Sequence, residues 1–100
     1  MPMIILKYEC PMLVKSFPYI EFEIEMRMNS KFLSFQEQHG IPVVWCLVDT
    51  SFEGRVKRKR KFRIYGTGIE IDYDYKDASF NYIGTIQLQD FVWHLFEIFE

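Results

Sequence analysis

The sequence predicts an all-β protein, a single small domain of about seven mainly antiparallel strands folded as a sandwich or a partly closed barrel. Nearly every segment alternates apolar and polar residues with a period of two, which is typical of strands buried on one side. No stretch shows the periodicity of a helix. With 49% hydrophobic residues, a chain of 100 residues can bury one sizeable core, so we expect one domain over residues 1–100.

The first expected strand covers residues 4–9, and Pro11 and Pro18 then indicate a turn region. The next strand, residues 19–26, alternates most clearly, because its apolar side chains share one face and its glutamates the other. The glutamates are Glu21, Glu23 and Glu25. We interpret this acidic row as a solvent-facing side of the strand, with an acidic binding site as the alternative.

A tight hairpin is expected where residues 31–38 and 41–49 flank His39-Gly40. The favoured two-residue turn needs positive φ twice, which glycine adopts freely and histidine more readily than most residues. Both faces of this hairpin carry large apolar groups, so we expect cover on both, from a sheet interior, a closed barrel or a partner chain. The pairs implied by a two-residue turn are Leu33–Cys46, Phe35–Val44, Phe32–Leu47 and Ser34–Trp45.

A basic run follows the polar loop expected at residues 50–56. Seven of the twelve Lys and Arg residues lie between Arg55 and Arg63, and the run leads into a strand expected at residues 62–65. Acidic residues follow soon after, so the run is either a contact surface or one half of a self-neutralising pair of segments. Basic strands also protect sheet edges from unwanted pairing.

The turn Gly66-Thr67-Gly68 invites comparison with phosphate-binding loops, because exposed main-chain N–H groups beside cations hold anions. The Gly-Lys-Ser/Thr signature and the dinucleotide fingerprint are both missing, and no helix is expected to begin there. We therefore interpret this segment as a turn or bulge, with an anion site as the alternative. Residues 69–81 are expected to form a long loop or an irregular edge strand.

The last two strands are expected at residues 82–88 and 91–99. Gln89-Asp90 is a poor two-residue turn, so we predict a connection of three or four residues. The final strand is apolar on both faces and should be central or covered by another chain. Within it, His94 is interpreted as a hydrogen-bonded core residue.

The sequence indicates no enzyme, no metal site and no cofactor. Neither a Ser/His/Asp nor a Cys/His arrangement can be assembled, and two histidines do not make a zinc site. Cys10 and Cys46 are too few for a disulfide framework, and Cys46 is expected to be a buried hydrophobe. No apolar run has the length of a membrane span, and the first residues lack the charge of a signal peptide. We therefore expect a cytoplasmic protein that does not bind membranes.

A set of short segments along most of the chain carries a family resemblance. These segments are Lys7-Tyr8-Glu9, Gln38-His39-Gly40-Ile41-Pro42, Trp45, Val48-Asp49, Phe62-Arg63-Ile64-Tyr65-Gly66-Thr67-Gly68, Tyr82-Ile83-Gly84-Thr85, Gln87 and Val92-Trp93-His94-Leu95-Phe96-Glu97. With them the chain resembles a family of small, uncharacterised proteins of bacteriophages and prophages, a domain of unknown function. The resemblance implies a phage origin and a small all-β fold, and it supplies no catalytic residues. The chain departs from the family pattern in an acidic, tyrosine-rich insert at residues 70–75 and in a longer basic run.

These features favour a non-enzymatic phage accessory protein that binds and inhibits or sequesters a host factor in the bacterial cytoplasm, with counter-defence as one such role. We expect the partner to be a host protein or a small anionic ligand, and the chain to form a homo-oligomer. A nucleotide- or nucleic-acid-binding module using the basic strand and the glycine turn is the second hypothesis, and a virion or assembly component is the third. The candidate ligand- or partner-binding residues are Arg58, Arg60, Arg63, Tyr65, Gly66, Thr67, Gly68, Trp93 and His94.

Overall fold

The computed structural model describes residues 2–11, 19–51, 53–71 and 79–99. They form seven strands and one short 3-10 helix, with no α-helix among them, which confirms the predicted all-β class. No helix in these ranges is long and apolar enough to cross a membrane. The elements are β1 (Met3–Glu9), β2 (Tyr19–Arg27), β3 (Lys31–Gln38), β4 (Ile41–Asp49), η1 (Glu53–Arg55), β5 (Lys57–Gly66), β6 (Phe80–Leu88) and β7 (Phe91–Ile98).

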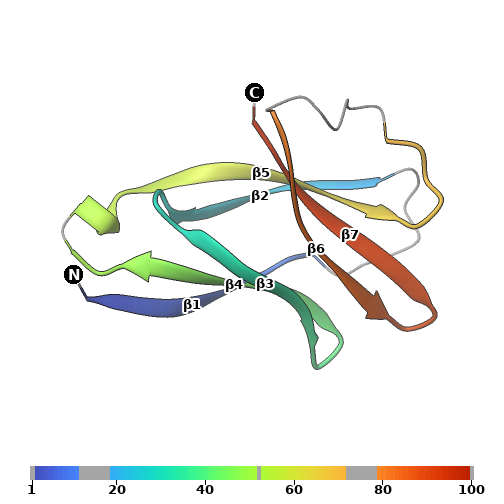
Figure 1. Cartoon of the computed structure of the whole chain (residues 1–100), viewed down its shortest axis with the longest axis horizontal. Coiled ribbons are helices and arrows are strands. Elements are labelled where there is room, and N and C mark those ends of the chain that lie inside the picture. Colours follow the sequence, from blue (N-terminus) through green and yellow to red (C-terminus); the bar gives the residue numbers. More distant parts are fainter. Residues whose placement is uncertain (1, 12–18, 52, 72–78, 100) are drawn as a thin grey trace.

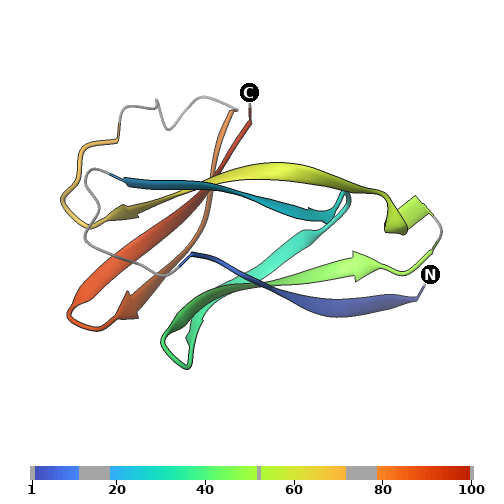
Figure 2. The ribbon, with the colours of Figure 1, turned by 180° about the vertical axis from the view of Figure 1, so that it is seen from behind.

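The strands form two antiparallel sheets that face each other. One sheet has the order β1-β4-β3 and the other the order β2-β5-β7-β6, without closure into a barrel. Figure 1 shows the long β2–β5 pair above β1 and β4, and Figure 2 shows the same layers from behind. In both views the turns of the β3–β4 and β6–β7 hairpins lie at the same end of the molecule. This arrangement confirms the sandwich alternative of the prediction.

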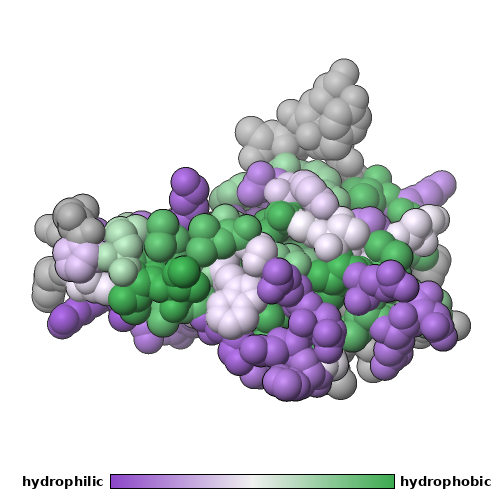
Figure 3. Space-filling model, turned by 60° about the horizontal axis from the view of Figure 1, so that its bottom comes forward, coloured by the Kyte–Doolittle hydropathy of each residue, from purple (hydrophilic) through white to green (hydrophobic). Residues whose placement is uncertain are grey.

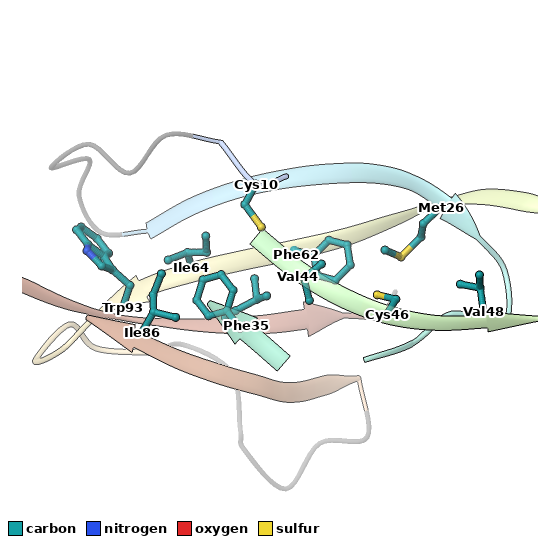
Figure 4. Packing of buried hydrophobic residues seen from close by; sticks show 11 residues of the cluster. Cys10, Met26, Phe35, Val44, Cys46, Val48, Phe62, Ile64, Ile86 and Trp93 are labelled. Carbon is teal, nitrogen blue, oxygen red and sulfur yellow. The ribbon is translucent and has the colours of Figure 1, made fainter. Parts of the chain in front are cut away.

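The main core fills the space between the sheets. Figure 4 shows its side chains pointing toward one another from both layers. Burial of such apolar groups contributes about 25 cal/mol per Å² and is the main term that favours folding. The buried members are Cys10, Met26, Phe35, Val44, Cys46, Val48, Phe62, Ile64, Ile86, Trp93 and Leu95.

The β3–β4 hairpin has the predicted two-residue turn, with φ of 53° at His39 and 80° at Gly40. The predicted pairs nearest the turn, Phe35–Val44 and Ser34–Trp45, are confirmed. The two pairs beyond them are wrong, because the register shifts between Phe32 and Ser34 and Phe32 pairs with Cys46. A bulge of this kind adds one residue to one strand and so moves the next side chain to the opposite face. Phe32 therefore packs against the core, whereas Leu33 is exposed.

The β6–β7 hairpin differs from the prediction at its turn. Leu88 pairs with Phe91, so Gln89-Asp90 is a two-residue connection and the expected longer loop is wrong. Gln89 adopts a φ of 59°, the left-handed conformation that few residues other than glycine adopt readily, which is why Gln89-Asp90 was judged a poor two-residue turn. The strand also shifts register between Tyr82 and Gly84.

The final strand β7 lies between β5 and β6, as its two apolar faces predicted. On one face Leu95 belongs to the main core. On the other face Phe96 stacks on Phe80 at a ring-centroid distance of 4.3 Å, in a second cluster on the outer side of the sheet. This outer cluster consists of Tyr65, Phe80, Phe96 and Ile98, with Tyr19 and Ile69 packed against it.

Candidate functional site

The basic run lies within β5, the longest strand, and its neighbour β2 carries the acidic row. The two strands pair antiparallel over their whole length. Cross-strand pairs of opposite charge stabilise a sheet by roughly 0.2–1 kcal/mol each. The three glutamates are exposed, as predicted, and they lie beside the cations of β5. The facing pairs are Glu21–Arg63, Glu23–Lys61 and Glu25–Lys59.

Arg63 and Tyr65 are buried in the outer cluster, with exposed fractions of 8% and 1%. Arg63 Nε donates to Glu21 Oε1 at 2.7 Å, and Arg63 Nη1 donates to the Tyr65 hydroxyl at 3.0 Å. The guanidinium lies 4.2 Å from the centroid of the Tyr19 ring. These two candidate residues therefore bind other parts of the same chain, and little of either side chain reaches the surface.

Arg60 forms a buried ion pair with Glu97, which β7 directs toward the space between the sheets. Arg60 Nε and Nη2 donate to the two Glu97 carboxylate oxygens at 2.5 and 2.7 Å, and Nη1 donates to the Ser30 carbonyl at 3.1 Å. The side chains are 9% and 2% exposed, and the guanidinium covers the Phe32 ring. Sequence reasoning missed Glu97. The one feature of the sequence that could have identified Glu97 is its charge within an apolar strand, because a buried charge requires a partner.

Trp93 and the glycine turn also have structural roles. Trp93 packs in the main core. In the turn, the Thr67 N–H donates to the Val92 carbonyl at 3.1 Å and the Ile69 N–H donates to the Gly66 carbonyl at 3.3 Å. An anion cradle needs several main-chain N–H groups directed at the ligand, and two of this turn's donors are already used.

His94 lies half-buried on the outer face of its sheet, whereas the sequence predicted a core position. Its Nε2 is 2.7 Å from the Thr67 hydroxyl, and its Nδ1 is 2.9 Å from the Thr85 hydroxyl. Tyr82 extends this chain of polar groups, since its hydroxyl is 2.5 Å from that of Thr85. Both ring nitrogens thus face hydroxyls, and neither faces a carboxylate of the kind that orients the imidazole in hydrolase triads.

The candidate residues do not form one site. Strand β5 has ten residues, so at about 3.3 Å per residue its ends are roughly 30 Å apart. The glycine turn and His94 lie near one end, and Arg58 lies near the other. Between them, the side chains of Arg60, Arg63 and Tyr65 are buried, so the strand does not present a continuous contact surface.

A hollow near the N-terminal end of β5 is lined by four of the basic residues of that strand. Strand β2 pairs with β5 from Lys57 onward, but β7 does so only from Lys61 onward. Beside the end of β7 lies a notch of about 430 Å³. We call it the basic notch, and its lining residues are Glu23, Arg58, Lys59, Arg60, Lys61, Glu97, Ile98 and Phe99.

Two cations of the basic notch, Arg58 and Lys59, are exposed, and no ion pair of theirs occurs among the residues that the structure describes. Glu97 does not cancel them, because its carboxylate is held by Arg60. Phe99 adds an aromatic residue that is 39% exposed. The basic notch therefore combines an excess of positive charge with an accessible aromatic side chain, while Glu23 also lines it and Glu25 faces Lys59.

The cysteines are free and buried, as expected for Cys46. Burial raises the pKa of the Cys10 thiol to about 12 and that of the Cys46 thiol to about 11. Such thiols remain protonated at neutral pH and are poor nucleophiles and poor metal ligands. Within the described ranges, no three His, Cys, Asp or Glu side chains approach closely enough to hold a metal ion.

The chain matches a protein family described as "Domain of unknown function (DUF7352)". The match covers residues 1–99 and so includes all the strands that the structure describes, both hairpins and the basic notch. No curated protein and no solved structure matches the chain.

Proposed function

Since the chain belongs to this family of unknown function, we propose that it is a non-enzymatic binding protein of phage origin that inhibits or sequesters a host factor in the bacterial cytoplasm. Counter-defence is one role of this kind. The basic notch is the observation that carries the proposal. Its exposed cations attract an acidic partner and speed association, while the pairs deeper in the sheet hold the strand in place.

The shape of the notch supports a binding role. Interfaces draw most of their energy from a few aromatic and arginine side chains in partly enclosed positions. Phe99 and Arg58 are side chains of these two types, and both line the basic notch. The buried ion pair between Arg60 and Glu97 fixes the wall beside them, which lowers the entropy lost on binding.

The test is native mass spectrometry of the protein purified from a bacterial host. We expect a complex of defined stoichiometry with one host factor, and we expect Arg58→Glu or Lys59→Glu to abolish it. Lys7→Glu is the matched control, because it makes the same charge change on β1, where Lys7 hydrogen-bonds Gln38 and does not line the basic notch. Equal capture of the host factor by the wild-type protein and all three variants would contradict the proposal.

A nucleotide- or nucleic-acid-binding module is the second candidate function. The volume of the basic notch lies within the range of small-molecule sites, and its cations suit phosphate. The Gly66-Thr67-Gly68 turn takes no part in this version, because it is roughly 30 Å away along β5. Binding through phosphates falls steeply as salt rises, whereas a protein partner held by aromatic anchors is less sensitive to salt.

The outer face of the β1-β4-β3 sheet supports self-association, the feature that a virion or assembly component requires. Ile5 is 59% exposed there, Met3 on the same strand is exposed too, and so is Leu33 on β3, on the far side of β4. Figure 3 shows this apolar area next to a hydrophilic one on the same side of the molecule. Exposed apolar groups that gather on one face are typical of surfaces between subunits.

A further inference from the structure

We infer that the basic notch binds the phosphate group of a small phosphorylated ligand of the mononucleotide type. This inference deepens the second candidate function and rests on it. Three properties of the notch carry it: a main-chain donor of β5 directed to the side of β7, exposed cations on both faces of β5, and the exposed aromatic residue Phe99.

Strand β5 directs a main-chain donor toward the side of β7. The Val56 carbonyl accepts a hydrogen bond from the Met28 N–H, so β5 directs the main-chain groups of Val56 toward β2. Main-chain groups alternate sides along a strand. Those of Lys57 and Lys59 therefore point to the side of β7, beyond Lys61–Ile98, the last pair of these two strands among the described residues. Lys59 also lines the notch, and phosphate oxygens accept hydrogen bonds from main-chain N–H groups of this kind.

Exposed cations lie on both faces of β5 at this end of the strand. Arg58 faces Met26 of the core side, whereas Lys59 faces Glu25 of the outer side. Both side chains are exposed at the end of the strand, so a group at the edge lies within reach of both. A guanidinium binds phosphate through two parallel hydrogen bonds, and an ammonium adds a compact charge. Two neighbouring residues thus supply three kinds of hydrogen-bond donor to a phosphate: the Arg58 guanidinium, the Lys59 ammonium and the Lys59 main-chain N–H.

The aromatic ring accounts for the organic part of the ligand. Phe99 borders the basic notch and also a second hollow of about 450 Å³ on the side of Phe32 and Tyr82. Stacking of a base on an aromatic side chain is worth roughly 1–3 kcal/mol. A ligand with its phosphate at Lys59 can extend along Phe99, which favours a nucleotide over free phosphate.

The test is isothermal titration of the purified chain with three probes at low salt. Adenosine monophosphate should bind saturably with one site per chain, inorganic phosphate at least 10-fold more weakly, and adenosine without detectable heat. Arg58→Gln and Lys59→Gln should each weaken binding of the monophosphate at least 10-fold. Lys7→Gln on β1 should leave it unchanged, and circular dichroism checks that all variants are folded.

The opposing outcomes are distinct. If adenosine monophosphate does not bind, or binds equally to Lys59→Gln, the cations only protect a sheet edge and the inference is wrong. If inorganic phosphate binds as tightly as the monophosphate, the ring of Phe99 takes no part and the mononucleotide assignment fails. A host protein captured in the mass-spectrometry experiment without any monophosphate binding would support the leading function and overturn this inference.

Discussion

At the scale of single residues, the most consequential contact is the ion pair between Arg60 and Glu97. Both side chains are almost fully buried, and Arg60 also binds the Ser30 carbonyl and covers the Phe32 ring. A buried charge pair repays its desolvation only when its geometry is good, but the loss of one partner leaves an unpaired charge. The pair therefore specifies how the N-terminal part of β5 meets the C-terminal end of β7.

Breaking this pair should destabilise the protein strongly. We expect Arg60→Met to lower the free energy of unfolding by about 3–5 kcal/mol, because Glu97 is left charged and buried. Adding Glu97→Leu should recover most of the loss, since two apolar groups need no partner. Urea unfolding measures both effects.

The control for that measurement is Glu25→Gln, since Glu25 faces Lys59 across β2 and β5 and both residues are exposed. Pairs that water reaches are worth about 0–1 kcal/mol, so the loss should be much smaller. If both variants lose the same amount, the burial of the Arg60–Glu97 pair is energetically unimportant.

The thiols give a pH prediction with a defined sign. Burial raises the pKa of Cys10 to about 12 and of Cys46 to about 11 from an ordinary value of 9.0. Unfolded thiols ionise first as pH rises, so the free energy of unfolding should fall above pH 9. Urea unfolding between pH 8 and about 10.5 measures the slope, which should be shallower in Cys10→Ala/Cys46→Ala. Rapid alkylation of either thiol in the native protein at pH 8 would contradict the burial.

At the scale of elements, two hairpins of similar design set the shape of the sandwich. Each has a two-residue turn and a register shift in its first strand, between Phe32 and Ser34 in one hairpin and between Tyr82 and Gly84 in the other. A Cβ at Gly84 would lie 2.9 Å from the Cβ of Phe35, so β6 and β3 approach each other there more closely than any other residue allows.

Gly84→Ala should therefore disturb the contact between the sheets. We expect a loss of about 1–3 kcal/mol in the free energy of unfolding, because the new methyl group must displace Phe35 or the strand. Gly66→Ala is the control, since its Cβ would meet its nearest neighbours at 3.7 Å, an ordinary contact. Thermal unfolding followed by circular dichroism compares the two, and equal melting temperatures would show that the close approach is not needed.

At the scale of the whole molecule, charge and apolar surface are segregated. The basic notch lies at one end of β5, and the exposed apolar side chains of Met3, Ile5 and Leu33 lie on the outer face of the other sheet. A protein with this division can bind a ligand at one surface and a second copy of itself at the other. Ligand binding at the basic notch and self-association through the apolar face are therefore independent proposals, and different variants test each of them.

Self-association through the apolar face predicts a dimer or larger oligomer in solution. Ile5→Lys should raise its dissociation constant at least about 10-fold, because a charge replaces an exposed side chain within the contact. Met28→Lys is the control, since Met28 is 50% exposed but lies in the turn between β2 and β3. Sedimentation equilibrium measures both, and a wild-type monomer throughout the concentration range would refute the prediction.

Local patterns in the sequence determined the class of the fold and several of its details. Period-two alternation identified the strands, His39-Gly40 identified a turn, and the two apolar faces of β7 placed that strand inside a sheet. These features depend on residues close together in the chain, so a single sequence reveals them. The exposed Arg58 was found in the same way, as part of a basic run.

Which of the charges remain available depends on the tertiary structure. Arg60 meets Glu97 across 37 residues, and Arg63 meets Glu21 across 42. Alternation fixes the face that a side chain takes, but the partner on that face depends on strand order and on the bulge that shifts the register. The sequence therefore marked all of β5 as a contact surface, whereas long-range pairing buried its middle and left an open notch at one end, where β7 stops short of Arg58 and Lys59.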